Sequence, residues 1–232
     1  TVIISMVLTP LTVQALKLLP KPVQSMDGID EPDGLVGDVL IIGFGRFGQI
    51  ASQALLAKGH RISTIDTDTE MIRAAGTFGF KVYYGDGTRL DILRAAGIEQ
   101  VELVIVAIDK RDDATRIVEL IHAEFPLVKV MARAFDRGHA LALIKAGADY
   151  QIREMFESAL TLSSEALRAL GANDVEINEL IEGVRERDRM RFAAQMAGGL
   201  QAGRDLLLSN ASQQARESGA VEKPSEPIML ER

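Results

Sequence analysis

The residues best suited to chemistry are three glycines at the end of an apolar run. The stretch VLIIGFGRFGQI, residues 39–50, contains Gly43, Gly45 and Gly48 in the spacing G-x-G-x-x-G. In this spacing the first glycine permits a tight turn, the second lets the backbone approach a pyrophosphate, and the third lets a helix pack closely on a strand. The N-terminus of the following helix favours phosphate. The motif therefore predicts a nucleotide site; a tight turn without a ligand is the alternative.

Acidic and small residues follow three later apolar runs. Asp66 ends the run RISTID, where a carboxylate accepts hydrogen bonds from ribose hydroxyls and disfavours a 2′-phosphate, so we expect AMP or NAD(H) rather than NADP. Ligands bind at the carboxyl ends of parallel strands, although Asp86 is also suited to a turn or a helix cap. The expected nucleotide contacts are Gly43, Gly45, Arg46, Phe47, Gly48, Asp66, Thr67, Asp68, Gly85, Asp86, Thr88, Ala107 and Asp109.

Residue types for covalent or metal chemistry are scarce. The chain has no Cys and three His, and neither His60 nor His122 has a neighbour at metal-ligand spacing. No Ser-His-Asp arrangement is visible, and no convincing acid–base residue for a dehydrogenase follows the glycine motif. The net charge is −7 without a basic block, so nucleic acid is not an expected partner. We therefore expect a sensor rather than an enzyme, with no metal site.

Short apolar runs alternate with amphipathic segments from Val39 onward. This alternation predicts βαβ units and a parallel sheet, so the fold class is α/β, a Rossmann-like doubly wound sheet followed by a C-terminal helical arm. Strands are expected at 39–43, 61–66, 81–86, 102–109, 128–133 and 148–153, and helices at 46–58, 68–78, 88–96, 111–125, 136–146, 154–170 and 173–197.

Several residues mark where these helices begin and end. Gly59 and Gly147 are typical of helix C-termini, and Asp68 is typical of an N-cap. Thr88 and Asp91 resemble a capping box, with Asp in place of the usual Glu.

The two ends of the chain differ from its centre. The uncharged run at residues 1–16 favours either the end of a transmembrane helix or a buried amphipathic helix. Residues 20–37 are rich in Pro, Gly and Asp, as linkers are. The expected organisation is an apolar segment at 1–19, a linker at 20–37, a nucleotide-binding domain at 38–153, a helical segment at 154–208 and a disordered tail at 209–232.

Several strings in a fixed order resemble one family over residues 36–200. They are GFGRFGQI, STIDTD, VYYGDGTRLDILRAAG, VIVAIDKRDD, VMARAFDRGHALALIKAGAD and IREMFESAL. They resemble the cytosolic RCK or KTN domain, which is TrkA-N-like, of Kef-type glutathione-regulated potassium-efflux antiporters. The resemblance also implies that residues 1–19 are the end of the last transmembrane helix and that residues 154–208 are a helical dimerisation and regulatory arm.

The resemblance implies a regulatory role at a membrane. Such a domain forms a homodimer, binds AMP or NAD(H), and restrains potassium efflux and proton entry through the antiporter domain of the same chain. That places this region on the cytoplasmic side of the inner membrane. The open alternatives are a soluble NAD-dependent oxidoreductase and a separate regulatory subunit of a potassium-uptake system.

The resemblance also implies a second ligand, glutathione or its adducts. Arg153 matches a family arginine that contacts glutathione, and Asp188 falls near a family asparagine with the same role. Gln53 stands where the family has another arginine, so one charged partner for the anion is absent. The alternative for Arg153 is a strand-end cation paired with Glu154 or Glu157.

Overall fold

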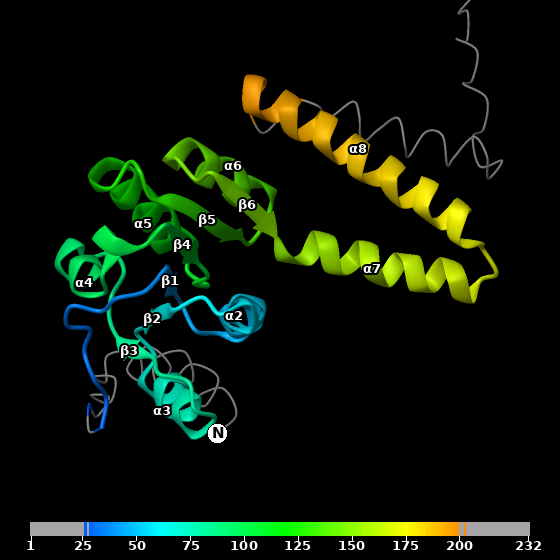
Figure 1. Ribbon diagram of the computed structural model, residues 1–232. Coiled ribbons are helices and arrows are strands. Elements are labelled where there is room, and N and C mark those ends of the chain that lie inside the picture. Colours follow the sequence, from blue (N-terminus) through cyan, green and yellow to red (C-terminus); the bar gives the residue numbers. More distant parts are fainter. Residues whose placement is uncertain (1–25, 27, 200–201, 203–232) are drawn as a thin grey trace, which may run out of the picture. The chain divides into compact units, whose positions relative to one another are not determined.

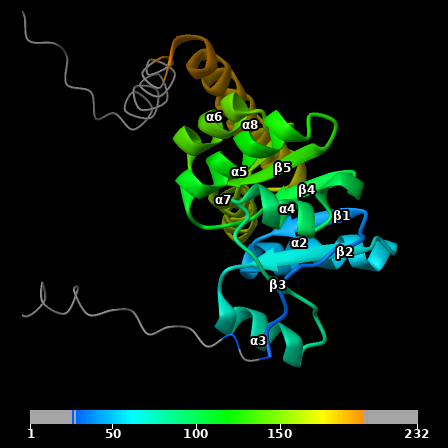
Figure 2. The same cartoon turned by 90° about the vertical axis from the view of Figure 1, so that its left-hand side faces the viewer.

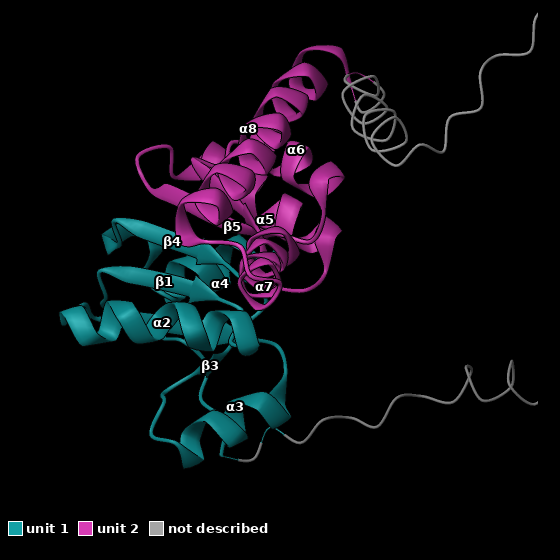
Figure 3. Ribbon diagram, turned by 90° about the vertical axis from the view of Figure 1, so that its right-hand side faces the viewer, with its two compact units in different colours: residues 1–107 teal, residues 108–232 magenta. Residues whose placement is uncertain are grey.

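The computed structural model describes residue 26, residues 28–199 and residue 202. The predicted transmembrane end at 1–19 and the predicted tail at 209–232 lie outside the described residues. The chain divides into two compact units, residues 1–107 and residues 108–232 (Figure 3). In the part of the chain that is described, no helix is both long and apolar enough to cross a bilayer.

The strands form a six-stranded sheet in the order β3-β2-β1-β4-β5-β6. The pairings β1–β2, β1–β4, β2–β3 and β5–β6 are all parallel. Figures 1 and 2 show the strands and the helices that connect them. This order is that of a doubly wound Rossmann sheet. The predicted fold class is confirmed for the sheet and for the helices that follow it.

Unit 1 contains the first four strands. Its elements are β1 (Val39–Ile42), α2 (Arg46–Lys58), β2 (Ile62–Asp66), α3 (Thr69–Thr77), β3 (Tyr83–Tyr84), α4 (Leu90–Ala95), the 3-10 helix η1 (Ile98–Gln100) and β4 (Leu103–Val106). All four residues of β1 are buried, as expected for a central strand of a parallel sheet covered on both faces. Val39 pairs with both Ile62 and Leu103, which fixes the register of three neighbouring strands.

Unit 2 contains the remaining strands and the helical arm. Its elements are α5 (Arg111–Glu124), β5 (Lys129–Ala134), α6 (Arg137–Ala146), β6 (Tyr150–Arg153), α7 (Glu154–Ala169) and α8 (Asp174–Gly198). Helices α7 and α8 pack against each other as a hairpin (Figure 1). Their contact is a small apolar cluster of Leu160, Ile177 and Ile181. Helix α8 is otherwise rich in charged residues, so this cluster provides most of its buried apolar surface.

The predicted boundary residues act mostly as expected. Gly59 and Gly147 end α2 and α6 in the left-handed conformation, and Asp68 caps α3 by accepting hydrogen bonds from the N–H groups of Glu70 and Met71. The capping box at Thr88 is wrong. Arg89 is the N-cap of α4 and makes no side-chain capping bond.

Candidate functional site

The glycine motif forms the turn between β1 and α2. Gly43 has a φ of 99°, a left-handed conformation that favours glycine, and its N–H donates to the carbonyl of Ile65 at 2.9 Å. Phe44, the next residue, is buried. The chain therefore turns sharply away from the central strand and is held against β2 as it turns.

Gly48 and Gly45 face different surroundings. A Cβ added to Gly48 would lie 2.2 Å from the carbonyl oxygen of Gly43, so only glycine allows α2 this close to the turn. A Cβ added to Gly45 would meet no atom within 4 Å. The space beside the backbone of Gly45 is therefore open, and the approach of a pyrophosphate to this position stays a prediction.

The N-terminus of α2 is unusually suited to an anion. Its N-cap, Gly45, has no side chain to bond the first N–H groups, and its first turn has no acidic residue. Among the described α-helices only α6 also lacks an acidic residue there, and α6 is capped by the carboxylate of Asp136. Arg46 is exposed and Phe47 half-buried in this first turn. Unlike the other described helices, α2 offers its positive dipole end to an external negative charge.

Asp66 links the end of β2 to the glycine turn. Its Oδ2 accepts a hydrogen bond from the N–H of Phe44 at 2.6 Å, and its Oδ1 accepts one from the N–H of Asp68 at 2.8 Å. Each oxygen of an ionised carboxylate has a second acceptor site, so Asp66 keeps capacity for ribose hydroxyls. Thr67 is exposed beside it. Asp68 caps α3 with Oδ1, which makes its role primarily structural.

The segment after β3 forms a compact turn. The Oδ1 of Asp86 accepts hydrogen bonds from the N–H of Thr88 at 2.9 Å and from its hydroxyl at 2.7 Å. The Thr88 hydroxyl is therefore engaged by Asp86, and Asp91 pairs with Arg89 instead, which explains why the capping box does not form. Gly85 is buried, and an added Cβ would lie 2.8 Å from Ile92.

The predicted residues after β4 fall on two sides of the unit boundary. Ala107 is buried in unit 1, where its N–H donates to the carbonyl of Ile42 at 2.8 Å. Asp109 belongs to unit 2, is exposed, and forms an ion pair with Arg133. Unit 1 therefore contains twelve of the thirteen predicted nucleotide contacts, all except Asp109.

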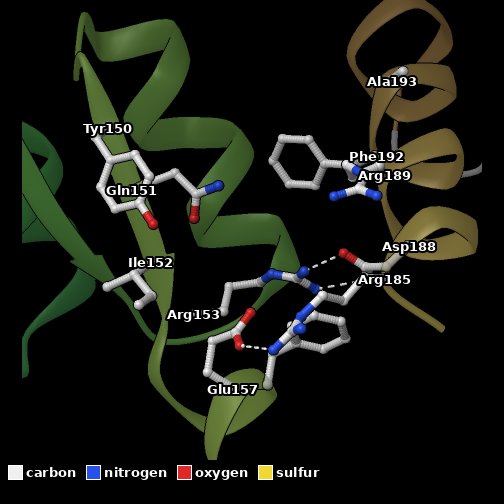
Figure 4. Close-up of a pocket in the computed structure, with 11 residues that line it drawn as sticks. Tyr150, Gln151, Ile152, Arg153, Glu157, Arg185, Asp188, Arg189, Phe192 and Ala193 are labelled. Carbon is white, nitrogen blue, oxygen red and sulfur yellow. Dashed lines mark hydrogen bonds and ion pairs between the residues drawn. The ribbon is translucent and has the colours of Figure 1, made fainter. Parts of the chain in front are cut away.

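A second candidate site is a pocket of about 480 Å³ in unit 2 (Figure 4). It lies between β6, α7 and α8 and mixes cationic, acidic and aromatic side chains. Its lining residues are Tyr150, Gln151, Ile152, Arg153, Phe156, Glu157, Arg185, Asp188, Arg189, Phe192 and Ala193. The Oε1 atom of Gln151 is buried and has no hydrogen-bond partner among the described residues.

Arg153 and Asp188 lie in direct contact in this pocket. The guanidinium groups of Arg153 and Arg137 both form ion pairs with the Asp188 carboxylate, and all three side chains are less than one fifth exposed. Burial lowers the pKa of Arg137, and the nearby carboxylate opposes that shift. The Arg153 guanidinium also lies 4.3 Å from the ring centroid of Phe156. The region is thus a carboxylate held between two arginines.

The alternative pairing for Arg153 is wrong. Glu154 pairs with Arg133 at 2.6 Å, and Glu157 pairs with Arg185 at 2.9 Å. No sequence pattern indicated Arg137, because this residue begins α6 and lies 51 positions before its partner. Gln53 is exposed on α2 in unit 1. The described residues include no group of three His, Cys, Asp or Glu side chains that could hold a metal ion.

The strand order, the glycine turn and the acid at the end of β2 define a Rossmann-type domain. The chain belongs to the TrkA-N domain family, whose pattern matches residues 39–154.

Named relatives narrow the class further. The chain is 43% identical over 205 residues to a glutathione-regulated potassium-efflux system protein of Haemophilus influenzae, covering 85% of this chain and 33% of that protein. It is 41% identical over 179 residues to the glutathione-regulated potassium-efflux system protein KefC of Cronobacter sakazakii, covering 77% and 29% respectively. The chain thus spans about a third of the length of these relatives.

One solved structure is similar to this chain over nearly all of the solved structure's own length. The Shewanella denitrificans Kef CTD in AMP-bound form superposes with a TM-score of 0.63 and is 37% identical, covering 68% of this chain and 97% of that structure.

Proposed function

We propose that this chain is a nucleotide-binding regulatory domain that gates a membrane potassium/proton antiporter. The observation that carries the proposal is the N-terminus of α2. It has no side-chain cap, the space at Gly45 is open, and the carboxylate of Asp66 is bonded to the same glycine turn. This arrangement fits a phosphate on the helix and a ribose on the acid. The names of the relatives, potassium-efflux system proteins, supply the link to transport.

AMP or NAD(H) is the proposed ligand, because the solved relative is in AMP-bound form and Asp66 disfavours a 2′-phosphate. The adenine ribose would bind Asp66, and the phosphate would bind the turn from Gly43 to Gly48. Asp86 and Thr88 are proposed to line the same crevice. Asp109 is engaged by Arg133 in unit 2, so the proposed site consists of residues of unit 1.

The proposed assembly is a homodimer on the cytoplasmic face of the inner membrane. Residues 1–19 would be the end of the last transmembrane helix, residues 20–37 a linker, residues 38–153 the nucleotide domain and residues 154–208 the dimerisation arm. The antiporter domain of the same chain would move potassium out and protons in. The role proposed for this domain is regulation, with no catalytic step of its own.

The pocket of unit 2 is proposed as a regulatory ligand site for glutathione or an adduct. Arg153, Arg185 and Arg189 provide positive charge, and Phe156 and Phe192 provide apolar surface. Asp188 already occupies the guanidinium of Arg153. An anionic ligand would therefore compete with Asp188, so we expect glutathione to bind weakly.

Calorimetry on the purified 232-residue chain tests the nucleotide site. We expect AMP or NADH to bind, and Gly45→Asp to abolish binding because its carboxylate would enter the proposed phosphate position and repel the ligand. Gly76→Asp is the matched control, since Gly76 is exposed in α3 and an added Cβ there would meet no atom within 4 Å. Binding of both nucleotides to Gly45→Asp with unchanged affinity would contradict the site.

Ion flux tests the regulatory role. Potassium-driven proton exchange would be measured in inside-out vesicles carrying the full-length parent protein or a form truncated after residue 35. We expect faster or unregulated exchange after truncation, because the domain would act as a brake. Steady substrate-dependent turnover of NADH by the purified chain would instead support an oxidoreductase.

A further inference from the structure

The described residues that precede β1 are hydrogen-bonded to β3 and α4 of unit 1. The N–H of Tyr84 in β3 donates to the carbonyl of Asp30 at 2.8 Å, and the N–H of Leu35 donates to the carbonyl of Ala95 at 3.1 Å. We call residues 28–37 the strap. These two bonds hold the strap at both the edge strand of the sheet and the end of α4.

Side chains reinforce this attachment. The Nζ of Lys81 lies 2.6 Å from Asp30, but both side chains are well exposed, so this pair contributes little. Ile29 packs against a buried cluster, and this apolar contact is the stronger interaction. The cluster consists of Phe44, Ile72, Ala75 and Val82, and Phe80 and Tyr84 also pack against it.

Phe44 belongs both to this cluster and to the glycine turn. Its backbone N–H donates to Asp66 at 2.6 Å. Its side chain is only 2% exposed, and its ring centroid lies 5.3 Å from that of Phe80. The same residue therefore contacts the proposed ribose acid through its backbone and the docking surface of the strap through its ring.

We infer that nucleotide binding at Asp66 and docking of the strap are energetically coupled through Phe44. A nucleotide on Asp66 and the glycine turn fixes the position of Phe44 and favours the arrangement that receives Ile29. Coupling between two sites is reciprocal, so release of the strap lowers the affinity for the nucleotide by the same factor. This inference rests on the proposed nucleotide site. It means that the strap is the segment whose docking changes when a nucleotide binds.

Hydrogen exchange in the 232-residue chain measures strap docking directly. The amides of Tyr84 and Leu35 are the reporters. The amide of Tyr84 donates to the strap, and the amide of Leu35 lies in the strap and donates to α4. The amide of Glu102, which donates to the carbonyl of Asp38 at 3.0 Å in the same unit, is the reference for global stabilisation. Saturating AMP should slow exchange at the two reporters about fivefold more than at the reference, at the lower end of typical coupling factors.

A pair of variants tests the reciprocal effect. Ile29→Ala removes the contact with the cluster, whereas Val36→Ala removes a similar side chain that is 56% exposed on the same strap. We expect Ile29→Ala to weaken AMP binding about fivefold and to remove the differential protection, with the fivefold value again taken from typical coupling. Val36→Ala should leave both unchanged.

The outcomes separate the inference from the proposed function. If AMP binds but protects the two reporters no more than Glu102, and if Ile29→Ala binds AMP as the unmodified chain does, the coupling is overturned and the nucleotide site stands. If neither AMP nor NADH binds the unmodified chain, the nucleotide site is overturned and the coupling falls with it.

Discussion

At the scale of single residues, the two later glycines of the motif have separable roles. Gly48 is needed for packing, since a Cβ there would lie 2.2 Å from a backbone oxygen. Gly45 is surrounded by open space, so the fold itself does not require glycine at this position. The spacing of the motif already assigns helix packing to Gly48 and a ligand to Gly45. The 2.2 Å distance confirms the packing role of Gly48, and the ligand role of Gly45 stays a prediction.

The first prediction compares alanine at these two positions. Gly48→Ala should lower the free energy of unfolding by about 2 kcal/mol, because overpacking against fixed backbone costs roughly 1–3 kcal/mol. Gly45→Ala should change it by less than about 0.5 kcal/mol, as expected for a site without new contacts. Urea unfolding followed by circular dichroism measures both. Equal destabilisation by the two variants would contradict the distinction.

The second prediction concerns His139, which is 6% exposed and accepts a hydrogen bond at Nδ1 from the N–H of Phe135. Burial, and next the positive charge of Arg111, lower the pKa of His139 from its ordinary value of 6.5. The imidazole of His139 therefore gains a proton more readily in the unfolded chain than in the folded chain. The free energy of unfolding consequently decreases as the pH falls below 6.5.

The urea midpoint of the chain should thus decrease between pH 7 and pH 5, the range in which an ordinary histidine gains its proton. His139→Asn keeps an acceptor for the N–H of Phe135 and removes this titration, so its midpoint should change less over the same range. His60→Asn, at a position whose side chain is 46% exposed, is the control. A decrease of the same size in His139→Asn would exclude His139 as the cause.

At the scale of elements, α8 is attached to its unit by contacts of two kinds. One is apolar, between α7 and α8 around Ile177. The other is ionic, where Asp188 joins Arg137 at the start of α6 and Arg153 at the end of β6. Removal of one member of a buried ion pair leaves the others without a counter-charge, at a cost of about 3–5 kcal/mol.

The third prediction follows from this ionic contact. Asp188→Asn should lower the free energy of unfolding by about 3 kcal/mol, because two largely buried guanidinium groups would face each other without a carboxylate. Glu186→Gln is the matched control on the same helix, since its pair with Arg189 is exposed on both sides. Exposed pairs contribute at most about 1 kcal/mol. Similar urea midpoints for the two variants would show that the arginines find other partners.

Local rules predicted most elements of this chain correctly. Helix α2 begins and ends where expected because Gly45 and Gly59 flank a clear amphipathic pattern. β3 is shorter than expected, since only Tyr83 and Tyr84 pair with β2. The Thr88 capping box failed because a local bond to Asp86 competes for the same hydroxyl.

From the residues alone, the candidate sites could be predicted only where their residues are close in sequence; Arg153 and Asp188, 35 positions apart, were named through the family resemblance. The glycine turn has a motif, and Asp66 follows it at a typical distance. Arg137 could not be found, because its contact with Asp188 depends on how α6 and α8 pack and leaves no periodic signal. The docking of Ile29 on the cluster around Phe44 could not be predicted either. A composition rich in Pro, Gly and Asp predicts a linker whether or not the segment packs against the folded unit.

At the scale of the whole molecule, α8 presents an apolar surface that its own unit leaves uncovered. Leu180 is 48% exposed and Val184 is 36% exposed, one helical turn apart. Helix α8 buries only Ile177, Ile181 and Gln195. Such a surface is suited to a second copy of the chain, in agreement with the proposed dimerisation arm.

The fourth prediction is that light scattering at tens of micromolar gives twice the mass of one chain. Leu180→Asp should reduce that mass to one chain, because a buried unpaired carboxylate opposes association. Leu127→Asp, at a fully exposed position of unit 2, should remain dimeric. A monomeric mass for the unmodified chain would count against the arm as a dimerisation element.

The bond between Tyr84 and Asp30 also affects how the chain behaves when it is shortened. β3 lies at the edge of the sheet, and an unpaired edge is a template for pairing with other chains. The carbonyl of Asp30 covers one donor of that edge. A fragment that starts at Asp38 would uncover it while keeping every strand of the sheet. Such a fragment should therefore aggregate at concentrations at which the 232-residue chain stays in solution.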